Sequence, residues 1–294
     1  MAGSGQIRQL RRRIRSVRST QKITRAMEMI AASRILKAQR RVLAARPYAE
    51  QIRDVIAGLA VDNEVRQHPL LRAREARDVA IVVCTSDRGL AGAYNANVLK
   101  VAERTIRDEE AAGRTVHLYV VGRKGAAYFA YRGRRAERAW DGISDTPTID
   151  GASGVAQAVM DRFSSEEFDR VWLVYTDFRS SLVQAPVRME LLPVKPAEFE
   201  GGTAMRPEVV FEPSGPGLID LLIPRYVEAK VLHALLESAA SEHASRQRAM
   251  KSATENASDV AASLSRVMNQ ARQDQITTEI SEIVGGAEAL SSAV

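Results

Sequence analysis

The sequence predicts an α/β fold: a Rossmann-like domain with a mostly parallel sheet, flanked by two long helices that pair as an antiparallel coiled coil. The first observation is that neither Gly nor Pro occurs between Gln6 and Arg46. The second is a run from Leu218 to Val284 that contains only Pro224. The third is the alternation of strand and helix patterns between these runs. We expect an N-terminal helix over 1–60, an α/β domain over 78–216 and a C-terminal helix over 217–294.

The length of the terminal runs is the reason for separating them from the domain. At 1.5 Å per residue the second run would span on the order of 100 Å. A domain of the size of the central region has a radius of gyration of only about 15 Å. The two helices are therefore expected to extend beyond the domain and to meet something outside the chain.

The N-terminal run has apolar residues at alternating steps of three and four, interrupted by a polar section in the same register. A second apolar stripe, formed by Ile23, Met27 and Ile30, lies on a neighbouring face. Pro47 is expected to kink or interrupt the helix, because it lacks an N–H donor. We expect the helix to end near Leu59, followed by a polar connector. The register comprises Ile7, Leu10, Ile14, Val17, then polar Gln21, Thr24 and Glu28, then Ala31, Ile35, Ala38, Val42 and Ala45.

The C-terminal run has a more regular heptad pattern, which predicts a left-handed supercoil with another helix. The simplest partner is the N-terminal helix of the same chain, packed antiparallel, and a dimeric coiled coil is the alternative. The register fails at Asp274, so the last turns are expected to extend beyond the paired region. The predicted seam comprises Met250, Ala253, Ala257, Val260, Leu264, Val267 and Ala271.

The central region alternates strands and helices, which is typical of a parallel sheet covered on both faces. Helices are expected from the turn after the first strand to about residue 110, and over 126–131 and 155–163. A short additional strand is expected at Val209–Glu212 within a Pro- and Gly-rich loop. The predicted strands are Val79–Cys84, Val116–Val121, Val171–Thr176 and Leu182–Pro193.

The composition restricts the class of protein. Apolar residues make up 45% of the chain, and the mean hydropathy of −0.20 fits a folded protein with a buried core. No apolar run reaches the roughly 18 residues of a membrane span, and arginines interrupt any N-terminal leader. The single cysteine, Cys84, excludes an internal disulfide. We therefore expect a soluble cytoplasmic protein without direct membrane insertion.

The net charge of +6 is distributed unevenly. Residues 1–50 contain thirteen basic residues against only Glu28 and Glu50, and the remainder of the chain is acidic on balance. Opposite charges at i,i+4 spacing are nearly absent, so this is not a self-neutralised helix face. Such a basic helix favours an acidic partner: a nucleic acid, an anionic lipid or acidic protein loops.

Catalytic motifs are absent from the central region. The turn TSDRGLAG follows the first strand, where such folds bind ligands, and Asp87, Arg88 and Gly89 are candidate phosphate contacts. The chain has neither GxGxxG nor a Walker lysine loop, so a turn that caps the following helix is the preferred interpretation. Ser86 lacks the flanking motif of a nucleophile. We expect no active site, cofactor or metal site; the histidines His68, His117, His233 and His243 form no metal-ligand pattern.

Three separated segments resemble the gamma subunit of the bacterial F-type proton-translocating ATP synthase. They are TQKITRAMEMIAAS near the N-terminus, TSDRGLAGAYN in the α/β domain, and the C-terminal ESAASEHASRQRAMKSATENAS with ARQDQITTEISEIVGGA. The resemblance implies a non-catalytic rotor subunit that couples proton flow to ATP synthesis and takes part in regulating ATPase activity. Its implied partners are the alpha and beta subunits of the catalytic hexamer, the epsilon subunit and the membrane c-ring. The implied location is peripheral, at the cytoplasmic face of the cell membrane.

The resemblance also implies contact residues. The catalytic ring is expected to meet Lys22, Arg25 and Met27, then Arg246, and finally Arg272, Gln273, Thr277 and Glu279. The membrane ring is expected to meet Arg206, Glu208, Phe211 and Glu212.

Two other functions remain open from the residues alone. The first is nucleic-acid binding through the basic helix, which the absence of aromatic residues from 1–47 and of any base-reading motif disfavours. The second is a nucleotide-dependent enzyme with helical arms.

Overall fold

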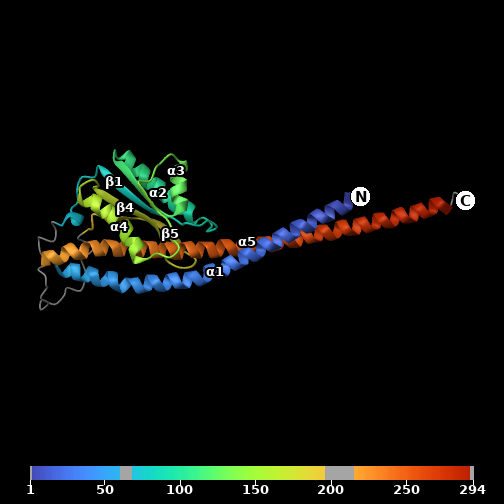
Figure 1. The fold of residues 1–294 in the computed structure, drawn as a ribbon, viewed down its shortest axis with the longest axis horizontal. Coiled ribbons are helices and arrows are strands. Elements are labelled where there is room, and N and C mark those ends of the chain that lie inside the picture. The colour runs from blue at the N-terminus through green and yellow to red at the C-terminus, as the bar shows by residue number, and fades with distance from the viewer. Residues whose placement is uncertain (1, 60–67, 196–214, 292–294) are drawn as a thin grey trace. The chain divides into compact units, whose positions relative to one another are not determined.

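The computed structural model describes residues 2–59, 68–195 and 215–291. The chain divides into a helical unit, made of residues 1–30 and 247–294, and a body unit of residues 31–246. The long helices α1 (Ala2–Leu59) and α5 (Gly215–Ser291) contribute to both units, and the sheet lies in the body unit (Figure 1). The predicted fold class, an α/β domain with long terminal helices, is confirmed.

The body unit is built on a five-stranded sheet with strand order β3-β2-β1-β4-β5. The first four of these strands run parallel, and β5 pairs antiparallel with β4 at one edge. The strands are β1 (Asp78–Cys84), β2 (Thr115–Val121), β3 (Arg138–Trp140), β4 (Arg170–Phe178) and β5 (Gln184–Leu192).

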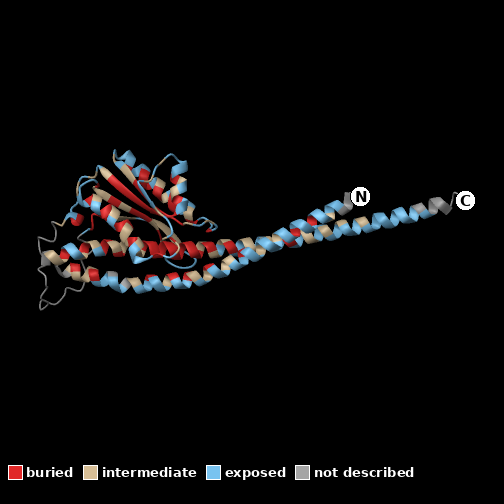
Figure 2. Ribbon diagram, viewed as in Figure 1, coloured by how far each residue is buried: buried red, intermediate tan, exposed pale blue. Residues whose placement is uncertain are grey.

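Alternate residues of β1 supply two hydrophobic cores, because successive side chains of a strand point to opposite faces. Val79, Ile81 and Val83 pack with α2 (Tyr94–Ala111) and α3 (Arg123–Tyr131). Ala80, Val82 and Cys84 belong to the core that includes α4 (Ile149–Ser164), the last part of α1 and the first part of α5. The sheet is therefore covered on both faces, as predicted, and Figure 2 shows buried residues in its central strands.

The predicted element list needs two corrections, and one further prediction is not tested. The three-residue strand β3 was not predicted; it is too short to show a period. The connector after α1 is not wholly polar, because the short 3-10 helix η2 (Pro69–Leu71) buries Leu70 and Leu71. The strand expected at Val209–Glu212 lies outside the described residues.

Neither of the two helical prolines ends a helix. Helix α1 continues through Pro47 without interruption. Pro47 and Leu43, whose carbonyl loses its usual donor, are both exposed, so water can satisfy that carbonyl. Pro224 lies inside α5, more than two turns after its first residue. The fully buried Ile223 and Val227 pack into the body core on either side of it and hold the chain helical.

In the helical unit, α1 keeps the predicted register through its polar section. Leu10, Ile14 and Thr24 are buried, whereas Ile23 on the neighbouring apolar stripe is 61% exposed. The Thr24 and Thr254 hydroxyl oxygens lie 2.8 Å apart. Because Thr24 meets Thr254 while residues 11–22 share a hollow with Ser265 and Met268, the two helices run antiparallel within one chain.

Two of the seven residues of the predicted α5 seam are wrong by one position. Met250 is buried and Ala253, Ala257, Leu264 and Ala271 are half-buried, as the predicted seam requires, but Val260 and Val267 are 47% and 48% exposed. Ala261 is buried and Met268 is half-buried in their place, and Gln275 is half-buried one residue beyond Asp274. In a heptad the step from one seam residue to the next can be three or four residues. From Ala257 and Leu264 the three-residue step leads to a valine, and the greater apolarity of valine favoured that step over the correct four-residue one.

Substituting aspartate separately at Ala261, which the structure buries, and at Val260, which the predicted seam buries, tests the register. Ala261→Asp is expected to destabilise the helical unit by about 2–3 kcal/mol, because a charge enters a buried, unpaired position. Val260→Asp is expected to change stability by less than about 0.5 kcal/mol, as for an exposed site. Amide hydrogen exchange over residues 7–30 and 250–275 measures both. A larger effect from Val260→Asp would restore the original seam.

Candidate functional site

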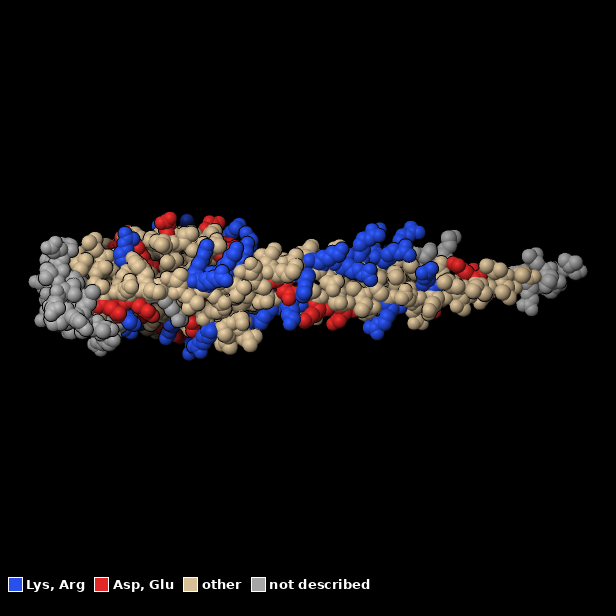
Figure 3. All heavy atoms as spheres, turned by 90° about the horizontal axis from the view of Figure 1, so that it is seen from below, with Lys and Arg blue, Asp and Glu red and all other residues tan. Residues whose placement is uncertain are grey.

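The helical unit carries a concentrated basic surface on α1. Arg11, Arg15, Arg18 and Lys22 recur at helical spacing and line a hollow of about 360 Å³. Figure 3 shows Lys and Arg side chains gathered along this part of the paired helices. A concentration of one sign of charge attracts an oppositely charged partner and speeds its association. This surface is therefore suited to acidic groups.

The predicted contact residues of the first helix lie beside this hollow. Lys22 lines it, Arg25 has a side chain 62% exposed and pairs with Glu28 at 3.2 Å, and Met27 is half-buried. Ile23 and Ile30 are exposed nearby. The segment therefore offers cationic and apolar side chains together, a combination found in protein interfaces.

The end of α5 offers a second surface. From Ile276 to Gly285 every described side chain is exposed, and the predicted contact residues Arg272, Gln273, Thr277 and Glu279 are exposed as well. Ile276, Ile280 and Ile283 form an apolar stripe at i, i+4 and i+7 that the sequence reasoning missed. The sequence pattern that could have predicted this stripe is the helical spacing of isoleucines that continues after the seam ends. An exposed stripe of this kind marks an interaction site.

Arg246 is not a surface residue. It lies in the body unit at 7% exposure, with Nη2 2.5 Å from Glu242 Oε1. The same nitrogen lies 3.3 Å from the carbonyl oxygen of Gly89 and 3.4 Å from that of Arg88. Its donors are therefore directed to groups of its own chain, which disfavours the predicted contact of Arg246 with an outside partner.

Glu242 and His243 extend this buried polar cluster. Glu242 is 1% exposed; its Oε2 has no hydrogen-bond partner among the described residues, and burial raises the pKa of its carboxyl to about 7 despite Arg246. His243 is 2% exposed and its Nε2 lies 3.3 Å from the carbonyl oxygen of Asp145. Burial lowers the pKa of His243 more than the neighbouring Asp145 raises it. The imidazole is therefore neutral at physiological pH.

The Asp87 carboxylate in the TSDRGLAG turn is used in hydrogen bonds within the body unit. Its carboxylate accepts hydrogen bonds from the backbone N–H of Arg123 at 3.1 Å, the N–H of Gly142 at 2.9 Å and the hydroxyl of Ser144 at 2.8 Å. The turn was expected to cap the helix that follows it. It caps α3 instead, and the N-cap residue of α2, Ala93, makes no side-chain cap. This use of Asp87 disfavours a phosphate site in the turn.

The remaining predictions fall outside what the structure describes or concern absences. Arg206, Glu208, Phe211 and Glu212 lie in the segment 196–214, which the structure leaves out. Within the described ranges, no group of three or more His, Cys, Asp or Glu side chains could hold a metal ion. No helix of the described chain is long and apolar enough to cross a bilayer.

The structure itself indicates a class of protein. The chain has paired helices with exposed charged and apolar surfaces, and an α/β body in which the polar residues of the TSDRGLAG turn are used in packing. Exposed surfaces of this kind are typical of a subunit that binds other proteins.

The family is shown by comparison with known proteins. A family model described as ATP synthase matches residues 6–290. The ATP synthase gamma chain of Frankia casuarinae is 50% identical, over 98% of this chain and 99% of the relative. That of Nocardioides sp. is 47% identical, over 98% and 97% respectively. The chain therefore belongs to the ATP synthase gamma-chain family, whose members are non-catalytic subunits.

Solved structures agree with this assignment. A chain from the central stalk and c-ring of the Tetrahymena thermophila mitochondrial ATP synthase matches with a TM-score of 0.61 and 26% identity, covering 79% of this chain and 99% of that one. A chain of the Euglena gracilis mitochondrial ATP synthase matches in fold with a TM-score of 0.69, covering 99% and 96%. The nucleic-acid alternative finds no support among these relatives.

Proposed function

We propose that this chain is the central-stalk rotor of a proton-translocating ATP synthase and couples proton flow to ATP synthesis at sites on other subunits. The observation that carries the proposal is full-length similarity to gamma chains at 50% identity. The Tetrahymena relative is part of a central stalk with a c-ring. In this proposal the chain supplies torque and the chemistry of ATP belongs to its partners.

The helical unit is the part that would meet the alpha and beta subunits. Its basic hollow and the neighbouring Lys22, Arg25 and Met27 would contact acidic loops of the catalytic subunits, because complementary charge gives specificity and fast association. Arg272, Gln273, Thr277 and Glu279 would engage a second loop. The adjacent isoleucine stripe would supply apolar contact area there.

The remaining partners follow from the same family assignment. The segment that contains Arg206, Glu208, Phe211 and Glu212 would contact the membrane c-ring, beside the epsilon subunit. The protein would then act as a peripheral subunit at the cytoplasmic face of the membrane, with a role in regulating ATPase activity. Cross-linking from a cysteine introduced at Phe211 to c-subunits in the purified complex tests this placement; cross-links only to alpha or beta subunits would contradict it.

Adding the purified chain to alpha and beta subunits tests the function. The chain alone is expected to hydrolyse no ATP. Together with the alpha, beta and epsilon subunits on membranes that hold the proton channel, it is expected to restore ATP-driven proton pumping. Hydrolysis by the chain alone, or failure to form a complex with those subunits, would contradict the proposal.

Charge reversal separates a specific contact from a diffuse basic field. Arg25→Glu is expected to lower proton pumping per ATP hydrolysed at least about fivefold, because like charges across an interface cost several kcal/mol. Arg40→Glu is the matched control, since Arg40 is also an exposed arginine of α1 but lies in the body unit. Pumping into inverted membrane vesicles, normalised to hydrolysis, is the measurement. Equal effects of the two reversals would indicate a diffuse field.

A further inference from the structure

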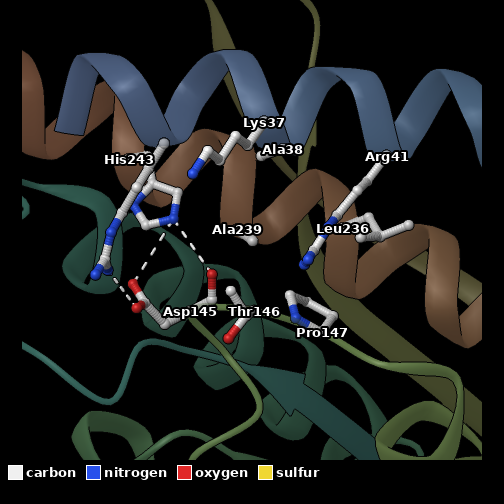
Figure 4. A pocket seen from close by; sticks show the side chains of 10 residues that line it. Lys37, Ala38, Arg41, Asp145, Thr146, Pro147, Leu236, Ala239 and His243 are labelled. Atoms are coloured by element: carbon white, nitrogen blue, oxygen red, sulfur yellow. Dashed lines mark hydrogen bonds and ion pairs between the residues drawn. The ribbon is translucent and has the colours of Figure 1, made fainter. Parts of the chain in front are cut away.

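The body unit contains a cavity that lies apart from the contact residues proposed above. It has a volume of about 280 Å³ and lies where α1, α5 and the loop at residues 145–147 meet. Figure 4 shows that Lys37 and Arg41 of α1 reach into this space from one side, with Asp145 and Pro147 on the opposite side. The cavity wall is therefore drawn from three segments far apart in the sequence.

The cavity has an excess of positive charge. Arg34, Lys37 and Arg41 line it with a single carboxylate, Asp145, which forms an ion pair with Arg34. Neither Lys37 nor Arg41 has an acidic or hydrogen-bonding partner among the described residues. Two like charges at i and i+4 on a helix destabilise it by a few tenths of a kcal/mol unless a counter-ion joins them. The surplus of two positive charges is therefore available to an external anion.

The surroundings strengthen this preference for an anion. Ala38, Leu236 and Ala239 are each under 9% exposed and form an apolar floor. Charges beside a low-polarity surface interact more strongly than charges in open water. His243 adds no positive charge, because its burial lowers the pKa of the imidazole.

We propose that this cavity binds a phosphate group, either as free phosphate or pyrophosphate or as part of a small phosphate ester. A phosphate group carries about −1.5 to −2 charges at neutral pH and matches the surplus of Lys37 and Arg41, whereas one carboxylate supplies only −1. Arginine binds phosphate oxygens in bidentate fashion and lysine binds them as a point charge. The volume is at the lower limit of ligand pockets, which fits a phosphate-sized group better than a large ligand.

Titration calorimetry on the full-length chain at pH 7.5 and constant ionic strength tests the proposal. The probes are inorganic phosphate, pyrophosphate, glycerol phosphate and the dicarboxylate succinate. Saturable binding is expected for pyrophosphate and for at least one of the other phosphate compounds, with succinate at least tenfold weaker. Tight glycerol phosphate binding would identify an ester ligand, and preference for phosphate or pyrophosphate would identify a free oxyanion.

Two variants locate the site. Lys37→Gln combined with Arg41→Gln is expected to weaken pyrophosphate binding at least tenfold. Both side chains are exposed, so the variant retains the fold. Arg40→Gln removes the same type of charge from α1 outside the cavity and is expected to alter binding less than twofold. No saturable binding, equal binding of succinate, or equal losses in both variants would overturn the proposal, and none of these outcomes bears on the rotor function.

Discussion

Replacing Arg246 with methionine is expected to lower the free energy of unfolding of the body unit by about 3 kcal/mol at pH 8.5. Removing one partner of a buried ion pair leaves the other charge uncompensated. Here that charge is Glu242, 1% exposed and 2.5 Å from the Arg246 guanidinium. Methionine keeps an unbranched, flexible stem, so little packing is lost. Urea unfolding followed by the fluorescence of Trp140 and Trp172, both in the body unit, measures the change.

The loss is expected to shrink at pH 6, because Glu242 can then take up a proton. Burial raises the pKa of this carboxyl from 4.5 to about 7 even with Arg246 present, and removal of the guanidinium raises it further. An equal loss at pH 6 and pH 8.5 would show that Glu242 does not control the effect.

The same carboxyl predicts a pH dependence in the unmodified chain. Its pKa is higher in the folded state than in the unfolded state, so the folded chain binds the extra proton. The resulting stability is present below pH 4.5 and is lost as the pH rises through about 7. Relative to Glu242→Gln, the unmodified chain is expected to lose about 3 kcal/mol between pH 4.5 and 8, at about 1.4 kcal/mol per pKa unit. A constant difference between the two chains would contradict the raised pKa.

Gly122→Ala is expected to destabilise the body unit by about 4 kcal/mol, within the range reserved for severe backbone and packing conflicts. Gly122 follows β2 with φ +94°, and a Cβ there would lie 2.3 Å from the carbonyl oxygen of Thr85. Thr85 is 2% exposed and its N–H is bonded to Val121, so it has little freedom to move away. The urea midpoint reports the loss.

Gly113→Ala separates the collision from the backbone strain. Gly113 also has positive φ, +75°, but a Cβ there meets no atom within 4 Å. Its replacement is expected to cost about 1 kcal/mol, from the left-handed conformation alone. Losses of similar size at the two positions would show that the contact with Thr85 is not the cause.

Local patterns in the sequence predicted most of the fold. Strand β1 contains a continuous apolar run and β2 ends in one, and the α1 seam keeps one period even where Gln21, Thr24 and Glu28 occupy it. The α5 seam was wrong at Val260 and Val267, since periodicity alone does not decide between Val260 and Ala261 when two heptad phases are possible. Their burial depends on the partner helix, which a single-segment pattern does not contain.

The surfaces were predictable to different degrees. The exposed residues near Lys22 and at the end of α5 lie on regular helices, so the sequence was sufficient to place them. The burial of Arg246 depends on Arg88 and Gly89, more than 150 residues away in the chain. The cavity beside Lys37 likewise needs residues near 145 and 240. Contacts of such long range have no periodic signal in the sequence.

ATP-driven rotation tests the rotor assignment most directly. Lys100 is exposed in the body unit, whereas the only natural cysteine, Cys84, is 1% exposed, and burial raises the pKa of its thiol to about 12. A probe attached to Lys100→Cys therefore reports on the rotation of this chain within a complex with alpha and beta subunits fixed to a surface. The account predicts continuous rotation in one direction when ATP is added. A complex that hydrolyses ATP while the probe stays still would contradict it.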